Sequence, residues 1–366
     1  MVAESASLAR QQAVDPELLP MPGPQSYLPV SRCFEATVAV TPEDRARAVV
    51  QAIRIAEKNG QTAAGTYSTG SSMHAFFNSR GLAAYYSETA AEFSVTMMAP
   101  TSSGWAKKNA PDVREINAEA LAARASDVAL RSHDPKELEP GKYVTILEPA
   151  AVLDLTGFMF FDFSGQAVHD KRSFLTGRMG QKLFGENISI SDDVYHPLQF
   201  GAQFDGEGVP RKVVRLVEKG VVKELTYARK TAKTMGAEPT GHGFPLPNEY
   251  GEAPMNIVFA GGNRSVDQMI ASTERGVLVT RMWYIREVDP YRKILTGMTR
   301  DGTFYVEDGK VKHGIRNFRF NESLIDLLSC VEMLGEPERA SGEESAPMVV
   351  PALKVGSFHF TEVTKF

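Results

Sequence analysis

Residues 204–210 read Phe-Asp-Gly-Glu-Gly-Val-Pro, and they stand shortly before a pair of strand-like segments. The two segments that follow, 213–217 and 221–227, flank a Glu-Lys-Gly turn, which is typical of a β-hairpin. Further on, Asp308-Gly309 separates two more strand-like segments, and this dipeptide strongly favours a tight hairpin turn. We therefore expect strands, mainly antiparallel, to dominate the second half of the chain.

The first half of the chain contains a helix pattern with signals at both ends. Thr41 fits the N-cap position, Pro42 fits the first helical position, and Asp44 follows the cap by three residues. Gly60 is placed to end the helix. In between, apolar residues recur at the spacing of one helix face: Ala46, Val49, Val50, Ile53 and Ala56.

Other elements are predicted from local signals. Strand-like runs between residues 65 and 98 are interrupted by a turn at 78–81, and a second helix is expected over 111–130. In the second half we expect a strand over 143–147, an apolar segment at 151–163, a loop over 335–346 and strands around 349–363. Three helices are also expected there. The first covers 166–184 and is interrupted by Gly177 and Gly180, the second covers 266–275 with Ser265 and Gln268 as a capping box, and the third is capped by Asn321.

The polar, Pro-bounded stretch 133–141 predicts a domain boundary. Residues 1–140 would form a smaller N-terminal mixed α/β domain, with an extended Pro-rich connector at 15–31 that contains Pro16, Pro20, Pro22, Pro24 and Pro29. Residues 141–366 would form a larger, strand-rich and mainly antiparallel C-terminal domain. The expected fold class is α+β.

Composition limits the function classes. The net charge of −5 argues against direct binding of nucleic acid. Cys33 and Cys330 are the only cysteines, too few for a disulfide framework, which suits a reducing compartment. The first residues have no apolar core typical of a signal peptide, and the apolar segment at 151–163 is too short to span a membrane. A cytoplasmic location is expected.

Several motifs in order resemble those of the TldD/TldE (PmbA) peptidase family, known also as peptidase U62 or the modulator-of-DNA-gyrase family. The resemblance covers roughly residue 40 to the end. The matching segments are Ser173-Phe-Leu-Thr-Gly-Arg-Met-Gly180, Ile190-Ser-Asp-Asp193, the stretch 204–210, Thr231-Ala232, Pro239-Thr-Gly-His-Gly243, Pro254-Met-Asn256, Asp289-Pro290, Thr296-Gly297 and Thr299-Arg-Asp-Gly302.

The resemblance also indicates what this chain lacks. TldD-like subunits carry His-Glu-x-x-x-His on a buried helix, which binds zinc and supplies a general base. Here the two ligand positions correspond to Asp154 and Met159, and the base position corresponds to Leu155. A further Cys ligand of TldD-like subunits corresponds to Ser341. Leu cannot accept a proton from water, and a thioether or a neutral hydroxyl is a poor zinc ligand.

The resemblance therefore implies a TldE/PmbA-like subunit with no metal or cofactor of its own and no catalytic residues. It implies pairing with a TldD-like catalytic subunit, which would hold zinc, in a protease for unfolded or small peptides. Relatives are longer at the amino terminus, so either a late start or an incomplete first domain is expected.

Four residues have both a functional and a structural interpretation, and three of them, Asp205, Glu207 and His242, are candidates for a substrate or interface surface. Asp205 and Glu207 could form an acid–base pair, or they could stabilise the turn in which they lie. His242 lies between two glycines and could line a partner or substrate surface, or it could be a hydrogen-bonded structural residue. Asp154 could be an oxygen ligand left after loss of zinc, or it could make an ordinary polar contact.

Two other functions compete with the silent-subunit interpretation. The first is a partner-independent binding or assembly protein, including a homodimer, that keeps the fold without protease activity. The second is an autonomous hydrolase with a site assembled from distant residues. The seven histidines are too widely spaced for a local zinc motif.

Overall fold

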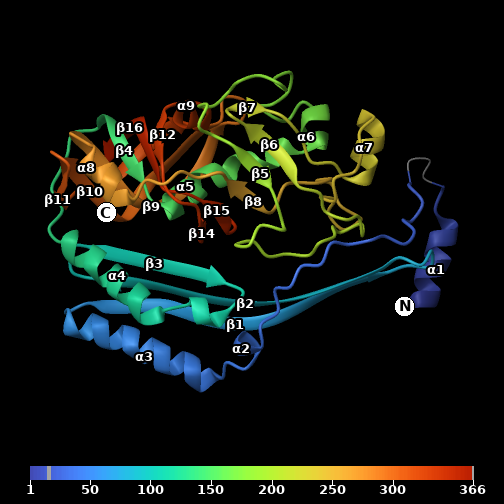
Figure 1. Ribbon diagram of the computed structural model, residues 1–366, viewed down its shortest axis with the longest axis horizontal. Helices are drawn as coiled ribbons and strands as arrows, with labels where there is room; N and C mark the ends of the chain where they lie inside the picture. Colours follow the sequence, from blue (N-terminus) through green and yellow to red (C-terminus); the bar gives the residue numbers. More distant parts are fainter. Residues whose placement is uncertain (15–17, 365–366) are drawn as a thin grey trace.

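The computed structural model describes residues 1–14 and 18–364 (Figure 1). Pro16 of the expected connector lies outside these residues. The N-terminal part is an antiparallel sheet of three strands in the order β1-β2-β3, and α3 and α4 pack on it. Its elements are α1 (Val2–Gln11), α2 (Glu35–Val38), α3 (Pro42–Lys58), β1 (Thr62–Phe77), β2 (Ala83–Met98), β3 (Ser103–Ala110), η1 (Val113–Glu115) and α4 (Ala118–Arg131).

Helix α3 begins where its sequence signals indicate. The Thr41 hydroxyl accepts a hydrogen bond from the Asp44 N–H, and the Asp44 carboxylate accepts one from the Thr41 N–H, which completes a capping box. The apolar face of α3 is only partly covered. Ala52 and Ala56 are buried, whereas Val49, Val50 and Ile53 remain exposed.

Thr41→Ala is expected to lower the free energy of unfolding of the N-terminal part by about 1 kcal/mol, because the Asp44 N–H loses its partner at the helix start. Urea denaturation followed by circular dichroism measures this change. Thr41→Ser keeps the acceptor oxygen and should stay close to the wild type. Equal losses in both variants would show that the cap hydrogen bond contributes nothing.

The hairpin of β1 and β2 turns at residues 78–81, as the sequence predicts. Its register runs without a shift from Thr62 opposite Met98 to Phe77 opposite Ala83. The prediction of a helix over 111–130 was wrong at its start. Asp112 caps the short η1, and Asn117 then caps α4, so the polar side chains divide this segment into two.

The C-terminal part contains a barrel beside a second sheet. The strand order of the barrel is β11-β10-β12-β16-β4-β9, and pairing of β9 with β10 closes it. All pairs are antiparallel except β4 with β9. The barrel strands are β4 (Gly141–Leu147), β9 (Arg275–Asp289), β10 (Ile294–Glu307), β11 (Lys310–Gly314), β12 (Phe318–Ser323) and β16 (Leu353–Val363), with β13 (Val331–Leu334) attached to β16.

The second sheet has the strand order β14-β15-β8-β5-β6-β7. Its strands are β5 (Ile190–Asp192), β6 (Val214–Glu218), β7 (Val221–Val222), β8 (Ile257–Phe259), β14 (Glu338–Ala340) and β15 (Met348–Val350). The remaining elements are α5 (Pro149–Thr156), η2 (Gly157–Phe163), α6 (Gly165–His169), α7 (Arg229–Met235), α8 (Val266–Ala271) and α9 (Leu324–Ser329). The fold class is therefore α+β, as expected, with a larger strand-rich C-terminal part.

Several local predictions were wrong. The helix expected over 166–184 ends at His169, because Lys171, Gly177 and Gly180 have positive φ and the chain continues in turns. Asn321 lies within β12, and Ser323 caps α9 instead. The helix after Ser265 has the expected capping box but ends at Ala271. The strand expected over 221–227 is limited to β7, and the loop expected over 335–346 contains β14.

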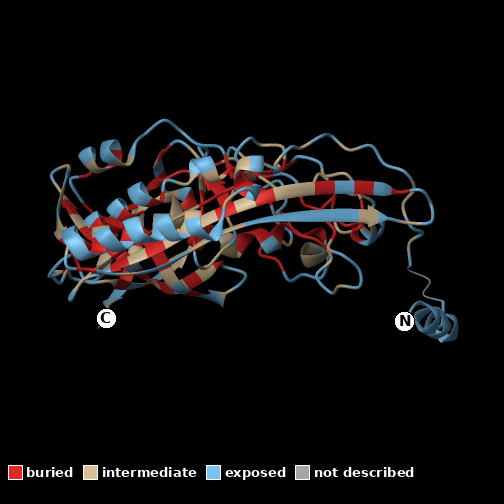
Figure 2. Cartoon of the chain, turned by 90° about the horizontal axis from the view of Figure 1, so that it is seen from below, coloured by how far each residue is buried: buried red, intermediate tan, exposed pale blue. Residues whose placement is uncertain are grey.

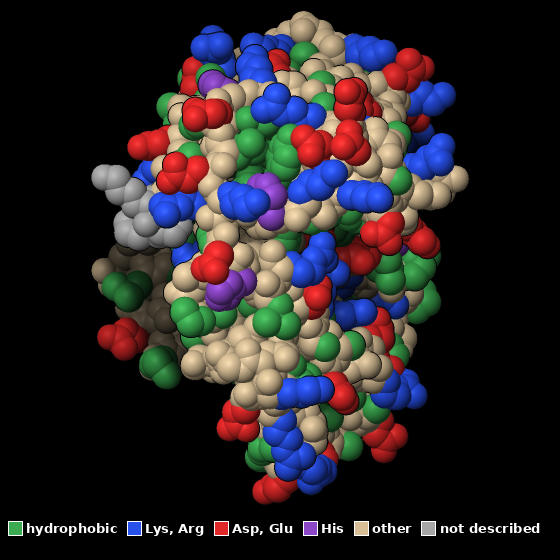
Figure 3. Space-filling view, turned by 90° about the vertical axis from the view of Figure 1, so that its left-hand side faces the viewer, with side chains coloured by type: hydrophobic (Ala, Val, Ile, Leu, Met, Phe, Trp, Pro, Cys, Tyr) green, Lys and Arg blue, Asp and Glu red, His purple; other side chains and the backbone are tan. Residues whose placement is uncertain are grey.

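The main core lies in the C-terminal part, where α5 and η2 pack between the barrel and the second sheet. Figure 2 shows this burial in red, and it shows β1 as a largely exposed strand in pale blue. On the face shown in Figure 3, basic and acidic side chains are interspersed.

Candidate functional site

Helix α5 carries the positions that correspond to the zinc motif. Pro149 occupies its first turn, and all residues from Ala151 to Thr156 are buried. The helix packs against the barrel strand β9 on one side and against β14 and β15 on the other. This placement brings Asp154 next to the loop that follows β14 and carries Ser341.

Asp154 is fully buried against that loop. Its Oδ1 accepts a hydrogen bond of 3.1 Å from the Glu344 N–H. A Cβ atom on Gly342 would lie 2.0 Å from the same oxygen, so the loop approaches closely only because residue 342 is glycine. Burial raises the pKa of Asp154 to about 7, although the Glu344 N–H and the Arg281 charge act in the opposite direction.

Leu155 and Met159 face the core. Both are completely buried in the main hydrophobic cluster. The α-helix gives way to a 3-10 helix at Gly157, so Met159 lies in η2 rather than on the helix that holds Asp154. Neither residue offers a donor atom to the space beside Asp154 and Ser341.

Ser341 is 4% exposed, and its hydroxyl has no hydrogen-bond partner among the residues that the structure describes. The second carboxylate oxygen of Asp154 is likewise buried without such a partner. One carboxylate and one neutral hydroxyl do not make the three-ligand set of a catalytic zinc. Within residues 1–14 and 18–364, no group of three His, Cys, Asp or Glu side chains could hold a metal ion. The residues at the motif positions therefore do not fit zinc.

Ser341 also borders a cleft between β3 and the C-terminal part. This β3 cleft has a volume of about 340 Å³ and is lined by Trp105–Pro111 of β3 and its end, by Leu121 and Arg124 of α4, by Glu148–Ala150 at the start of α5, and by Pro337–Ser341 around β14. Its charged side chains are of both signs, so the cleft suits a mixed polar chain better than a single anion or cation.

Two basic residues tie the walls of the β3 cleft together. Arg339 donates to the Gln199 side chain at 2.8 Å and to Asn109 of β3, and its guanidinium lies 3.7 Å from the centre of the Phe200 ring. Burial lowers the pKa of Arg339 to about 10. Lys107 of β3 donates to the Gly342 carbonyl at 3.2 Å and pairs with Glu343. The loop beside Asp154 is thus anchored to the N-terminal sheet.

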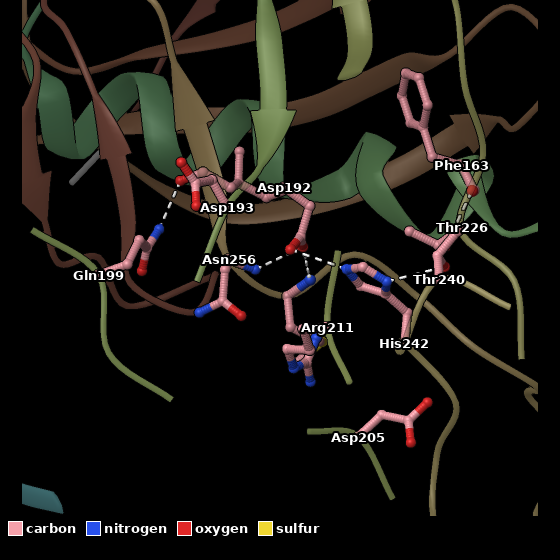
Figure 4. A network of polar contacts seen from close by, with 12 residues as sticks. Phe163, Asp192, Asp193, Gln199, Asp205, Arg211, Thr226, Thr240, His242 and Asn256 are labelled. Atoms are coloured by element: carbon pink, nitrogen blue, oxygen red, sulfur yellow. Dashed lines mark hydrogen bonds and ion pairs between the residues drawn. The ribbon is translucent and has the colours of Figure 1, made fainter. Parts of the chain in front are cut away.

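His242 lies in a separate buried network (Figure 4). Its Nε2 is 2.9 Å from Asp192 Oδ1, within ion-pair distance but without hydrogen-bond geometry, and its Nδ1 is 3.0 Å from the Thr240 hydroxyl. The other carboxylate oxygen of Asp192 accepts hydrogen bonds from the backbone N–H groups of Met255 and Asn256. Burial alone would raise the pKa of Asp192, but His242 and the other partners hold it below its usual value.

Asp205 and Glu207 are occupied by backbone groups. Asp205 accepts hydrogen bonds from the N–H groups of Glu207, Val209 and Gly243, each at 2.8–2.9 Å. Glu207 accepts the Arg229 N–H at 2.9 Å and lines a different cavity of about 560 Å³. Burial raises the pKa of both carboxyls. Neither residue nor His242 lines the β3 cleft, so the structure does not bring them together with Asp154 and Ser341.

Sequence reasoning missed Arg281. This buried residue of β9 pairs with Asp301 at 2.7 Å and lies over the rings of Trp105 and Trp283. It also acts electrostatically on Asp154. The available signal was a single charged residue within the otherwise uncharged run 276–285, whose first seven residues, 276–282, are all buried in the structure.

Comparison with known proteins now identifies the class to which this architecture belongs. Residues 140–362 match the PmbA/TldA metallopeptidase C-terminal domain, and residues 35–132 match the PmbA/TldA metallopeptidase central domain. Because the first match alone covers more than half of the chain, this protein belongs to the PmbA/TldD metallopeptidase family. The sequence had indicated the same family.

Individual relatives are distant. The chain is 21% identical to the metalloprotease PmbA of Escherichia coli O157:H7, over 85% of this chain and 68% of that protein. It is 25% identical to a metalloprotease of Methanothermobacter thermautotrophicus, over 60% of this chain and 49% of that protein. A match to an uncharacterized protein of Methanocaldococcus jannaschii, at 35% identity, spans 35% of this chain and 31% of that one. The alignments thus span half or less of the last two proteins.

Two solved structures share the fold. TldE from Thermococcus kodakarensis aligns with a TM-score of 0.88 and 22% identity, over 99% of this chain and 84% of that chain. A putative modulator of a DNA gyrase from Thermotoga maritima aligns with a TM-score of 0.86 and 22% identity, over 98% of this chain and 82% of that chain. In the part of this chain that the structure describes, no helix has the length and apolar character needed to cross a membrane.

Proposed function

We propose that this protein is a non-catalytic, TldE/PmbA-like subunit that pairs with a TldD-like subunit in a metallopeptidase for unfolded or small peptides. The observation that carries the proposal is the chemistry of the motif positions. Asp154 is held by the loop after β14, Leu155 and Met159 are core residues, and Ser341 offers only a neutral hydroxyl. The zinc and the general base would belong to the partner.

In this proposal the chain contributes binding surface rather than chemistry. The β3 cleft, with charges of both signs and the apolar side chains of Trp105 and Leu121, supports a role in holding a peptide segment. His242, Asp205 and Glu207 stay candidates for the subunit interface, although their side chains are engaged internally. Residues 1–140 and 141–366 would act as two domains with the β3 cleft between them, and the complex would work in the cytoplasm without contact to nucleic acid or membrane.

The deciding experiment compares the purified chain alone with the chain mixed with a TldD-like subunit from the same organism. We expect no stoichiometric zinc and no peptidase activity alone, and activity in a stable complex that exceeds that of the TldD-like subunit by itself. Zinc and activity in the isolated chain would refute the proposal. Failure to associate with any TldD-like subunit would favour a partner-independent binding or assembly protein.

A second variant tests the ligand assignment. The triple change Asp154→His, Leu155→Glu and Met159→His should not create a peptidase, because Ser341 is not a thiolate and residue 159 lies in η2 with its side chain in the core. The measurement is zinc content together with hydrolysis of an unfolded peptide. Circular dichroism and the melting temperature of the triple variant, compared with those of the wild type, show whether it folds. Zinc-dependent hydrolysis by the triple variant would show that the ligand positions are assigned wrongly.

A further inference from the structure

The cavity that Glu207 lines contains a buried carboxylate with one unused oxygen. This Glu207 pocket has a volume of about 560 Å³ and is bordered by residues of α6 and α7, two helices that pack against each other (Figure 1). Glu207 is only 7% exposed. Its Oε2 accepts the Arg229 N–H, but Oε1 has no partner among the described residues and is not sealed from solvent. Such an oxygen at the wall of a cavity is suited to bind a cationic group of a ligand.

The Glu207 carboxylate is held in place from two sides. The Arg229 N–H donates to Oε2 at 2.9 Å, and a Cβ atom on Gly243 would lie 2.5 Å from the same oxygen, so the backbone of residue 243 packs directly against it. Burial raises the pKa of Glu207, and the charges of Asp205 and Glu252 add to this rise, although Arg229 acts in the opposite direction. A carboxylate in these surroundings gains more from an added positive charge than an exposed one, because water screens it less.

The Arg229 guanidinium provides the positive charge of the pocket. It does not pair with the Glu207 carboxylate, and its Nη2 instead donates to the main-chain carbonyl of Pro20 at 2.5 Å. Leu18 and Leu19 of the same segment border the cavity. In the part of the chain that the structure describes, Nε and Nη1 of Arg229 make no hydrogen bond. The guanidinium therefore already binds a peptide carbonyl and keeps donors for a second oxygen.

An apolar wall completes the pocket. Phe244, Leu246 and Pro247 line it, and Phe244 stacks on Phe161. The turn that carries this wall is held by Asn248, whose side-chain amide donates to the Phe244 carbonyl at 3.1 Å. Because Leu246 is 66% exposed, the wall is open to an apolar side chain of a ligand.

We propose that the Glu207 pocket binds the amino end of a peptide, or a free amino acid, whose first side chain is apolar. The α-ammonium group binds Oε1 of Glu207, and the adjacent carbonyl or carboxylate binds Arg229. The apolar side chain packs on Phe244 and Leu246. The amino end enters first, because Glu207 is buried whereas the contact of Arg229 with Pro20 is exposed. The inference does not depend on the proposed silent-subunit function, since the Glu207 pocket and the β3 cleft share no lining residue.

The charges around the pocket favour a ligand with both signs over a simple ion. Besides one histidine, the titratable lining consists of two acidic residues, Glu207 and Asp170, and two basic ones, Arg229 and Lys230. Asp170 is paired with Arg172 at 2.9 Å. A simple cation or anion would meet a like charge inside the pocket. An ammonium group next to an oxygen acceptor, in contrast, finds an opposite charge for each of its two ends.

Isothermal titration calorimetry of the full chain with the tripeptide Leu-Gly-Gly tests the proposal. N-acetylation of the peptide should weaken binding at least about tenfold, because it removes the charge that Glu207 binds. Asp-Gly-Gly should also bind more weakly, since a carboxylate would lie on the apolar wall beside Glu207. Free leucine distinguishes the two sources: equal affinity would assign the pocket to an amino acid, and tighter binding of the tripeptide would assign it to a peptide. Absence of binding at millimolar peptide, or equal affinity for the acetylated form, would overturn the proposal.

Glu207→Gln places the ligand in the pocket. The change keeps an oxygen for the Arg229 N–H but removes the charge, so affinity for Leu-Gly-Gly should fall at least about tenfold and the preference over the acetylated peptide should disappear. Glu249→Gln alters an exposed glutamate in the neighbouring turn that does not line the pocket, and it should change neither. Circular dichroism and melting temperatures show whether both variants fold, and the comparison of free with acetylated peptide on the wild type holds in either case. Wild-type affinity in Glu207→Gln, or equal losses in the two variants, would refute the site.

Discussion

Asp154→Asn is expected to raise the free energy of unfolding at pH 8 by up to about 4 kcal/mol. The pKa of this buried carboxyl rises from 3.8 to about 7 in the folded protein, a shift of about three units at 1.36 kcal/mol each. Above pH 7 the folded protein must keep a charge in a site where desolvation opposes it. Asparagine removes that charge and keeps an oxygen for the Glu344 N–H.

The sign of the pH dependence follows from the raised pKa. Between about pH 4 and pH 7 the folded state holds a proton on Asp154 that the unfolded state has released, so the stability of the wild type falls as the pH rises. Below pH 4 both states are protonated, and above pH 7 both are ionised, so this contribution levels off. The Asn variant should lack this component of the slope.

Urea denaturation at half-unit intervals from pH 4.5 to pH 8.5 measures the effect. Asp127→Asn is the matched control, because Asp127 lies on the surface of α4 in an exposed pair with Arg131. Its stability should change little, and its pH dependence should match that of the wild type. Parallel curves for Asp154→Asn and the wild type would mean that Asp154 is ionised in the folded protein throughout this range.

Local sequence signals predicted the elements whose ends are fixed by neighbouring residues. Thr41 and Asp44 set the start of α3, and Asp308-Gly309 sets the hairpin of β10 and β11, because each signal acts within a few residues. The prediction of a helix over 166–184 was wrong after residue 169, because the apolar residues that follow lie in a compact series of turns. The apolar spacing on α3 was real, but spacing cannot show whether a neighbour covers Val49 or Ile53.

The candidate site was predictable only in part. The identities of Asp154, Leu155, Met159 and Ser341 could be assigned by resemblance alone. The environment of Asp154 could not be predicted from the sequence, because Glu344 and Arg281, which act on its carboxylate, come from distant parts of the chain. The same holds for His242, whose partner Asp192 lies on β5. Contacts of this kind depend on how the barrel and the second sheet pack around α5, and no local pattern encodes that packing.

Arg281→Met is expected to lower the free energy of unfolding by about 3–5 kcal/mol, the usual cost when one partner of a buried ion pair is removed. Arg281 and Asp301 are both less than 5% exposed and lie 2.7 Å apart. Without the guanidinium, the carboxylate of Asp301 would keep only the hydrogen bond from the Ser103 hydroxyl and a longer ion pair with the half-exposed Arg300 at 3.7 Å. The Trp105 and Trp283 rings would also lose a stacked cation.

Three comparisons separate this effect from a general loss of packing. Arg286→Met removes a guanidinium from the same strand, but its contact with Glu344 is exposed on the arginine side, so a change below about 1 kcal/mol is expected. Arg281→Met combined with Asp301→Asn should cost less than the sum of the single changes, because no charge remains buried. Finally, the pH range over which stability falls should extend above pH 7 in Arg281→Met, since the Arg281 charge lowers the pKa of Asp154. An additive double variant together with an unchanged pH range would show that Arg281 stabilises the fold by packing alone.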